Sequence, residues 1–90
     1  MKYRSRTEIV AMMLESARSG ATKTKIMYKA YLSYAQVMEY LKHLQQNDLL
    51  AYEEGTQLYR PTEKGLRFLN LSNDLNEMAV IPNSKYNWNS

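Results

Sequence analysis

Apolar residues recur at helical spacing through the first half of the chain. A first helix is predicted over residues 6–18, because apolar side chains return there every three or four positions. Ser5 or Thr7 can cap its start, and Gly20 can supply the left-handed residue that ends it. The predicted inward face of this helix comprises Ile9, Val10, Met13, Leu14 and Ala17.

Two further helices are predicted to follow closely. The first is short, covers residues 25–30 and is capped by Thr22 or Thr24. The second begins after the N-cap Ser33 and runs to about Asn47. The apolar stripe of this longer helix comprises Val37, Tyr40, Leu41 and Leu44. The helical period breaks between the two helices, which indicates that a short turn joins them.

The pattern changes after this third helix. Residues 49–53 and 58–60 are short apolar-containing runs separated by four residues, which predicts a β-hairpin. Gly55 stands where a tight hairpin favours a positive backbone angle. Pro61 is predicted to end the second strand, because proline cannot donate a hydrogen bond to its neighbour.

A last helix is predicted to begin after the N-cap Thr62 and to end before Pro82. The predicted fold is therefore mainly α with a small β-hairpin, in the order helix, helix, helix, strand, strand, helix. Residues 1–80 form one domain in this prediction, and residues 81–90 form a polar C-terminal tail. Two helices joined by a short turn and followed by a hairpin are typical of a winged helix-turn-helix.

The last helix carries two apolar stripes. Leu66 and Leu69 lie on one side, whereas a second stripe with three-four-three spacing lies nearly opposite at about 100° per residue. A helix packed on a small domain needs only one stripe, so the second predicts a homodimer interface. Alternatively, the chain bends near residues 70–73, or Trp88 covers this stripe. The predicted interface residues are Phe68, Leu71, Leu75 and Met78.

Charge is distributed unevenly along the chain. Residues 1–47 hold eight Lys or Arg against three Glu, and residues 48–90 hold four against six acidic residues. A basic N-terminal half favours a polyanionic partner such as double-stranded DNA. The alternative is a solvated cationic surface without a partner.

Several residues are candidates for DNA contact. In a helix-turn-helix the second helix of the pair enters the major groove, where glutamine can pair with adenine. Lysines at the start of the preceding helix can neutralise phosphates. Their alternative roles are surface polarity and helix capping. The candidate DNA-binding residues are Lys23, Lys25, Lys29, Ser33, Tyr34, Gln36, Lys42 and Arg60.

Tyrosines are interleaved with lysines around the predicted turn. Tyr28 and Tyr31 are expected to be mainly packing residues whose hydroxyls reach the surface, whereas Tyr34 is placed to touch a partner. The basic residues before the first helix predict either an arm in the minor groove or a solvated, frayed terminus. These basic residues are Lys2, Arg4 and Arg6.

The residue inventory argues against other classes of function. The chain has no cysteine, and its one histidine, His43, has no clustered carboxylates nearby in sequence, so neither a metal site nor a catalytic base is expected. No cofactor and no enzymatic activity are predicted. No apolar run approaches the roughly 18 residues of a membrane span, and a soluble cytoplasmic protein is expected.

Three segments also resemble a known group of proteins. They are Gly20-Ala-Thr-Lys-Thr-Lys-Ile-Met-Tyr-Lys-Ala-Tyr-Leu-Ser-Tyr34, Tyr40-Leu41-x-x-Leu44 and Tyr59-x-Pro-Thr-Glu-Lys-Gly65. These segments are similar to small archaeal winged-helix proteins, a group that includes ten-kilodalton chromatin-associated DNA binders and related predicted transcriptional regulators. The resemblance covers residues 5–80. Its most specific parts are Lys-Thr-Lys-Ile-Met-Tyr and Leu-Ser-Tyr.

This resemblance implies a winged-helix fold, double-stranded DNA binding and often a dimer built through the last helix. It places Lys23 and Lys25 beside the DNA backbone, and it places Ser33, Tyr34 and Gln36 at the groove. The implied role is transcriptional regulation or association with chromatin in the nucleoid.

The chain departs from the group at its wing tip, which carries Glu53 and Glu54 where a phosphate-following wing favours lysine or arginine. It also departs in its last helix, which Pro82 is expected to shorten. The acidic wing supports an alternative function, in which the winged helix is a protein-interaction module that does not bind DNA.

Overall fold

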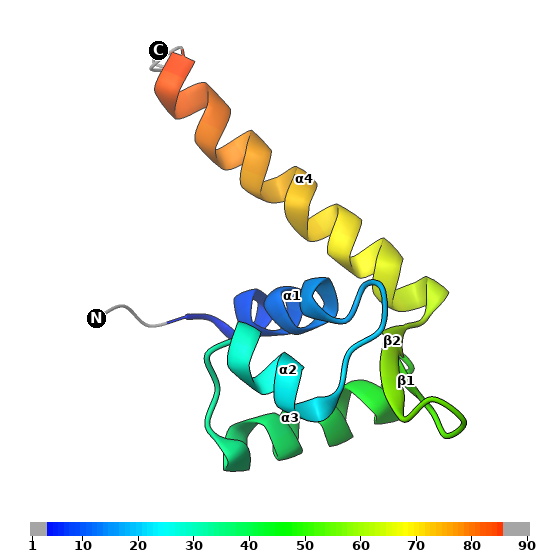
Figure 1. Ribbon diagram of the computed structural model, residues 1–90. Helices are drawn as coiled ribbons and strands as arrows, with labels where there is room; N and C mark the ends of the chain where they lie inside the picture. Colours follow the sequence, from blue (N-terminus) through cyan, green and yellow to red (C-terminus); the bar gives the residue numbers. More distant parts are fainter. Residues whose placement is uncertain (1–3, 86–90) are drawn as a thin grey trace.

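The computed structural model describes residues 4–85, with the surroundings of side chains described for residues 4–75. The predicted order of elements and the mainly helical fold with one hairpin are confirmed (Figure 1). The elements are α1 (Arg6–Ser16), α2 (Lys23–Lys29), α3 (Tyr34–Gln46), β1 (Leu50–Glu53), β2 (Leu58–Pro61) and α4 (Glu63–Lys85).

Side-chain caps determine where the first three helices begin. Ser5, rather than Thr7, caps α1: its hydroxyl accepts the Glu8 N–H at 3.0 Å, and the Glu8 carboxylate accepts the Ser5 N–H at 2.8 Å. Thr22, rather than Thr24, caps α2, and Ser33 caps α3 as expected. These caps satisfy backbone N–H groups that have no partner within the helix.

Left-handed residues end α2 and α3. Tyr31 has a φ of 55° and Asp48 a φ of 60°, and each follows the C-cap residue of its helix. In both cases the next residue donates its N–H back to the last turn, and the bond from Leu49 to the Leu44 carbonyl is 2.8 Å long. This is the Schellman arrangement, in which glycine is the usual left-handed residue.

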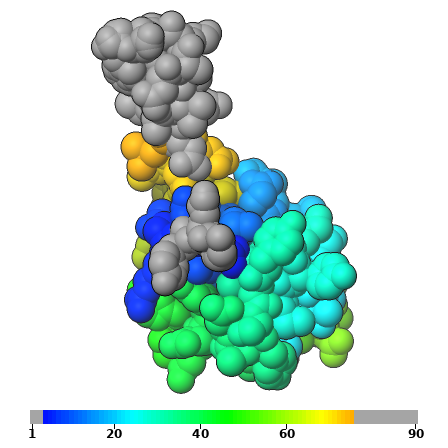
Figure 2. All heavy atoms as spheres, turned by 90° about the vertical axis from the view of Figure 1, so that its left-hand side faces the viewer, coloured from blue at the N-terminus to red at the C-terminus, as the bar shows by residue number. Residues whose placement is uncertain are grey.

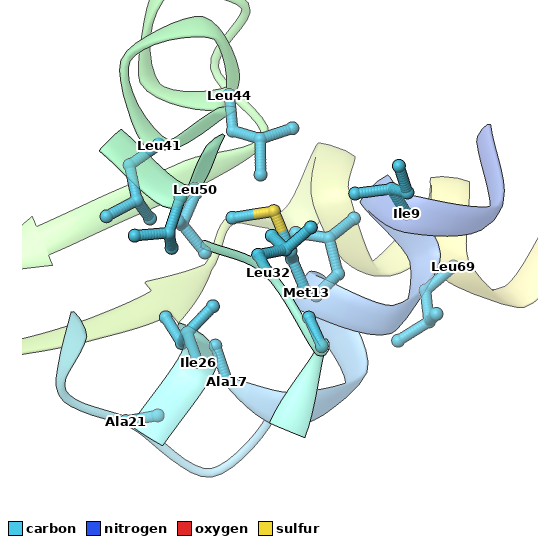
Figure 3. Packing of buried hydrophobic residues seen from close by; sticks show 13 residues of the cluster. Ile9, Met13, Ala17, Ala21, Ile26, Leu32, Leu41, Leu44, Leu50 and Leu69 are labelled. Carbon is cyan, nitrogen blue, oxygen red and sulfur yellow. The ribbon is translucent and has the colours of Figure 1, made fainter. Parts of the chain in front are cut away.

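The hydrophobic core lies between α1, α2, α3, the hairpin and the start of α4 (Figure 3). Each helix contributes at least one side chain that is almost completely buried, which accounts for the tight association of these short elements. The largest fully buried side chains are Met13, Leu14, Ile26, Val37, Leu44 and Leu69.

The hairpin is antiparallel, with Leu50 opposite Pro61 and Tyr52 opposite Tyr59. The rings of these two tyrosines lie 4.8 Å apart between centroids, which stabilises the pair across the strands. An additional bridge connects Tyr59 to Ala21, in the loop between α1 and α2, through two backbone hydrogen bonds of 3.0 and 2.8 Å. This bridge attaches the wing to the loop that precedes α2.

The turn of the hairpin differs from the prediction. Gly55 does not adopt a positive φ, and a Cβ added there would meet nothing within 4 Å. The left-handed residue is instead Gln57, with a φ of 60°, and its N–H donates to the Glu53 carbonyl at 2.7 Å. A four-residue loop therefore requires the unusual angle at its last position, not at the glycine.

The last helix is longer than predicted. Pro82 does not end α4, which continues to Lys85 and therefore crosses the predicted boundary at residue 80. Proline removes one hydrogen bond from a helix interior but does not oblige the helix to end there. Gly65 sets the start of α4 against the domain, since a Cβ there would lie 2.1 Å from the Leu49 carbonyl oxygen. Beyond α1 the helix extends away from the body of the domain (Figure 1).

Candidate nucleic-acid interface

The first turns of α2 and α3 are each fixed by a side-chain cap. The Thr22 hydroxyl accepts the Lys25 N–H at 3.1 Å. The Ser33 hydroxyl accepts the Gln36 N–H at 3.1 Å, and the Gln36 side-chain oxygen accepts the Ser33 N–H at 2.9 Å. Ser33 and Gln36, both candidates for base contact, are therefore joined in a capping box. The amide N–H groups of the Gln36 side chain remain available as donors.

A cation–π contact brings these two first turns together. The Lys23 ammonium lies over the Tyr34 ring, 5.3 Å from its centroid. Lys25 and Lys29 are exposed on α2, about one turn apart, and both lie on one flank of the buried Ile26. The positive ends of both helix dipoles and the charge of these lysines therefore favour an anion on the same side.

The outward face of α3 carries few charges. Val37, Leu41 and Leu44 are buried, and residues about 180° from them at 100° per residue face solvent. This outward face holds one cation and one anion, Lys42 and Glu39. The exposed residues of α3 are Tyr34, Ala35, Gln36, Met38, Glu39, Lys42, His43, Gln45 and Gln46.

Arg4 does not form the expected arm. Its guanidinium donates to the carbonyl oxygens of Ala30 at 2.5 Å and Tyr31 at 2.8 Å, at the C-terminal end of α2. The residue is partly buried, so it is not a solvated, frayed terminus either. Arg4 and Ala30 are 26 positions apart, and a contact between such distant residues leaves no pattern from which the sequence could predict it. Lys2 lies outside the described residues, and Arg6 forms the exposed first residue of α1.

The expectation that Tyr28 and Tyr31 are packing residues is wrong. Tyr28 is 80% exposed and Tyr31 is 76% exposed, compared with 60% for Tyr34. Tyr28 lies two positions, or about 200°, from Ile26, whose side chain fills the inward face of α2. Tyr31 occupies the left-handed turn position and points away from the core. All three tyrosines are therefore accessible to a partner.

Arg60, the arginine of the wing, is paired with an acidic residue of the same hairpin. The Arg60 Nε donates to the Glu53 carboxylate at 3.3 Å, and the Thr56 hydroxyl donates to the same oxygen at 2.6 Å. The hydrogen bond from Thr56 and then that from Arg60 lower the pKa of Glu53 below its ordinary value. The Arg60 guanidinium also lies against Gly20, whose φ is 97°. The carboxylate of Glu53 partly neutralises the charge that Arg60 could offer to a phosphate.

Two residues of the predicted second stripe of α4 are exposed, and their role in a dimer interface stays a prediction. Leu71 is 58% exposed and Leu75 is 56% exposed, and both lie outside the core. Phe68 instead packs against the core cluster, beside the buried Leu69, so its assignment to a separate stripe is wrong. Phe68 lies about 100° from Leu69 around α4 and is partly buried, so it borders both the core-facing side and the exposed side of the helix. The side chain of Met78 lies outside the described residues.

The described residues bring no three His, Cys, Asp or Glu side chains together in a way that could hold a metal ion. The single histidine, His43, is exposed on α3. Among the described residues, no helix is both long and apolar enough to cross a membrane.

The fold defines the class of the protein. The chain matches the winged helix-turn-helix family over residues 3–80 and belongs to that family. The resemblance drawn from the sequence is confirmed at this level. Among solved structures, the chain is similar to Sso10a-2, a DNA-binding protein from Sulfolobus solfataricus, with a TM-score of 0.76 and 22% sequence identity over 93% of this chain and 90% of that one. At this identity the likeness establishes a shared fold. No curated protein matches the chain.

Proposed function

We propose that this protein binds double-stranded DNA without enzymatic activity, with α3 in the major groove and the first turn of α2 on the phosphate backbone. The observation that carries the proposal is the contact between Lys23 and Tyr34, 5.3 Å from ammonium to ring centroid. This contact joins the first residues of two capped helices and adds positive charge there. Such a pair of N-termini suits a polyanion whose groove admits one helix.

The lysines supply the proposed phosphate contacts. Lys25 and Lys29 extend from the exposed side of α2, and Lys42 extends from the outward face of α3. Lys23 is partly buried beneath Tyr34 and acts by its charge and by holding the ring. Contacts of this kind fix the position of a protein on the duplex and carry no sequence information.

Base reading in this proposal is limited. Gln36 can offer its amide N–H groups to a base edge, although its oxygen is held by the Ser33 N–H. Tyr34 and Ser33 border the same first turn, and Ala35 on the outward face and the exposed Met38 beside it offer only apolar contact. Because few side chains can read bases, the protein is proposed to bind DNA with little or modest sequence specificity. Its role would be transcriptional regulation or organisation of the chromosome in the cytoplasm.

The same proposal includes a homodimer formed through α4. The helix has 23 residues and is about 34 Å long at 1.5 Å per residue. Leu71 and Leu75 are exposed on it, four positions apart, and Met78 follows three positions later in the sequence, which is the spacing of a coiled-coil seam. Pairing two α4 helices would bury these leucines and present two copies of α3 to one duplex.

The role of the α2 lysines can be tested with a charge-matched pair of variants. Lys25→Gln is expected to weaken binding to duplexes of any sequence and to make the slope of log affinity against log salt shallower by about one unit. Arg18→Gln removes the same charge from a residue that pairs with Glu15 at 3.0 Å, outside α2 and α3. Fluorescence anisotropy with two unrelated duplexes measures both. Equal slopes for the two variants would contradict phosphate contact by Lys25.

The alternative function is a protein-interaction module. The observation that favours it is the pairing of Arg60 with Glu53, which leaves the wing without an uncommitted arginine. In that case α3 would contact another polypeptide through Met38 and its neighbours, and wild-type binding to duplex DNA would be weak at every salt concentration tested.

A further inference from the structure

Three tyrosines have exposed side chains on the surface of the helix-turn-helix, and none of them contributes to the hydrophobic core. Tyr28 lies in the last turn of α2, Tyr31 lies in the turn between the helices, and Tyr34 is the first residue of α3. A tyrosine ring usually finds at least partial burial, because most of its surface is apolar. The exposure of all three within seven consecutive residues therefore calls for a binding role.

Tyr31 makes this argument strongest. Its φ of 55° lies in the left-handed region, which side chains with a Cβ avoid and glycine adopts freely. The turn needs only the backbone of this residue: the Tyr31 N–H donates to the Tyr28 carbonyl at 3.2 Å, and the Leu32 N–H donates to the Met27 carbonyl at 3.0 Å. Neither the turn nor the core accounts for an aromatic side chain here.

Two of the tyrosines share one hollow. Tyr28 and Tyr31 line an open cavity of about 540 Å³ together with Met27, Lys29 and Leu32. Figure 2 faces the side of the molecule on which the α2–α3 turn lies, and the surface of this segment, cyan to green, is open there. Tyr34 follows three residues after Tyr31, at the start of α3, and the Lys23 ammonium lies over its ring. Aromatic surface and positive charge are thus adjacent.

The charge around the rings selects the kind of partner. No aspartate or glutamate occurs between Glu15 and Glu39, whereas this interval contains Arg18 and the three lysines of α2. A polyanion is therefore favoured over an ordinary protein surface. In duplex DNA the faces of the bases are stacked on one another and are not accessible to a ring. Unpaired bases expose both faces, and their stacking on tyrosine is tolerant of sequence.

We propose that Tyr28, Tyr31 and Tyr34 form a stacking platform for unpaired bases, so that the protein binds single-stranded nucleic acid through them. We call these three residues the tyrosine platform. The bases stack on the rings, while Lys25 and Lys29 lie beside the phosphates of the same strand. This activity does not depend on the proposed insertion of α3 into the major groove, and the two can be measured separately.

The test compares a 15-nucleotide oligothymidine with an abasic strand of the same length, which has the phosphates but no bases. Fluorescence anisotropy at fixed salt is expected to show clearly tighter binding of oligothymidine by the wild type. Tyr28→Ser/Tyr31→Gly is expected to weaken oligothymidine binding by roughly tenfold or more, the effect of losing base–aromatic stacking. Its affinity for the abasic strand and for a blunt duplex is expected to stay within about twofold of wild type.

The variants are chosen so that folding does not obscure the result. Tyr28 is exposed, and glycine is favoured at the φ of Tyr31, so the double variant should unfold at a temperature no lower than the wild type. Tyr52→Ser, on the wing, is the matched control and should leave oligothymidine binding unchanged.

Equal wild-type affinity for the oligothymidine and the abasic strand would overturn the proposal, because the bases would then contribute nothing. Undiminished oligothymidine binding by Tyr28→Ser/Tyr31→Gly would overturn it as well. If the wild type binds oligothymidine but does not bind the duplex, the proposed function is contradicted and the tyrosine platform is supported.

Discussion

Leu71→Glu/Leu75→Glu is expected to convert a dimer into a folded monomer. These two leucines are the large apolar side chains that α4 exposes within the described residues, at 58% and 56%. Complete burial of one leucine contributes about 1.5–3 kcal/mol, so burying the exposed half contributes roughly 0.8–1.7 kcal/mol. Two leucines from each of two chains then supply about 3–7 kcal/mol of association free energy.

That sum is compared with a cost of about 4–15 kcal/mol for the lost translational and rotational freedom of two molecules. The two leucines are therefore necessary for the dimer but marginal alone, and the part of α4 that follows Leu75 has to extend the seam. A dissociation constant in the micromolar range is expected. Removing about 3 kcal/mol or more raises this constant by at least about 100-fold, and four glutamates facing one another add repulsion.

Analytical ultracentrifugation at tens of micromolar measures the association state, and circular dichroism measures the fold. Asn70→Glu/Asn73→Glu is the matched control, since it adds the same charge at exposed positions of α4 about 100–200° from the leucines. The wild type and this control should be dimers, and Leu71→Glu/Leu75→Glu should be a folded monomer. A monomeric wild type, or a leucine variant that stays dimeric, would refute the reasoning.

Three other outcomes are expected. Gly65→Ala should lower the free energy of unfolding by at least about 1–3 kcal/mol in urea denaturation, because its Cβ would lie 2.1 Å from the Leu49 carbonyl oxygen; an unchanged stability would show that α4 shifts freely. Ser33→Ala should cost about 0.5–2 kcal/mol in the same assay through loss of the α3 cap, and no loss would contradict the capping role. Glu53→Gln weakens the partner of Arg60, so duplex affinity should rise and its salt slope should steepen by up to about one unit; an unaltered slope would keep Arg60 away from DNA.

Local chemistry made much of this fold predictable. Ser5, Thr22 and Ser33 stand immediately before apolar-periodic runs, and capping depends on residues within one turn of chain. The sequence therefore predicted the helices and their order, with small differences at the ends. The exposure of Tyr28 could also have been found, since it lies about 200° from Ile26 on the same short helix.

Other features depend on distant parts of the chain. The bond from the Arg4 guanidinium to the Ala30 carbonyl and the backbone bridge from Ala21 to Tyr59 each join residues more than 25 positions apart. The acceptor in the first and all the groups in the second belong to the backbone, which every residue carries. The left-handed angle at Gln57 arises from the length of the wing loop rather than from its residue type. No sequence pattern distinguishes these positions from their neighbours.

The candidate site was predicted in its members but not in its arrangement. Lys23 and Tyr34 were both chosen as partners of DNA, yet nothing in the sequence indicated that the ammonium lies over the ring. Ser33 and Gln36 were chosen for base contact, and the structure shows that each first satisfies the other at the start of α3. Polar groups that were expected to bind a ligand are thus partly occupied by hydrogen bonds within the fold.

The salt dependence of wild-type binding to duplex DNA tests the central claim most directly. Four lysines, Lys23, Lys25, Lys29 and Lys42, are proposed to neutralise phosphates, and each contributes about −0.9 to the slope of log affinity against log salt. A slope of about −3 to −4 is predicted, which is roughly a hundredfold loss of affinity between 50 and 200 mM salt. A slope shallower than about −1, or no measurable binding at low salt, would contradict the account.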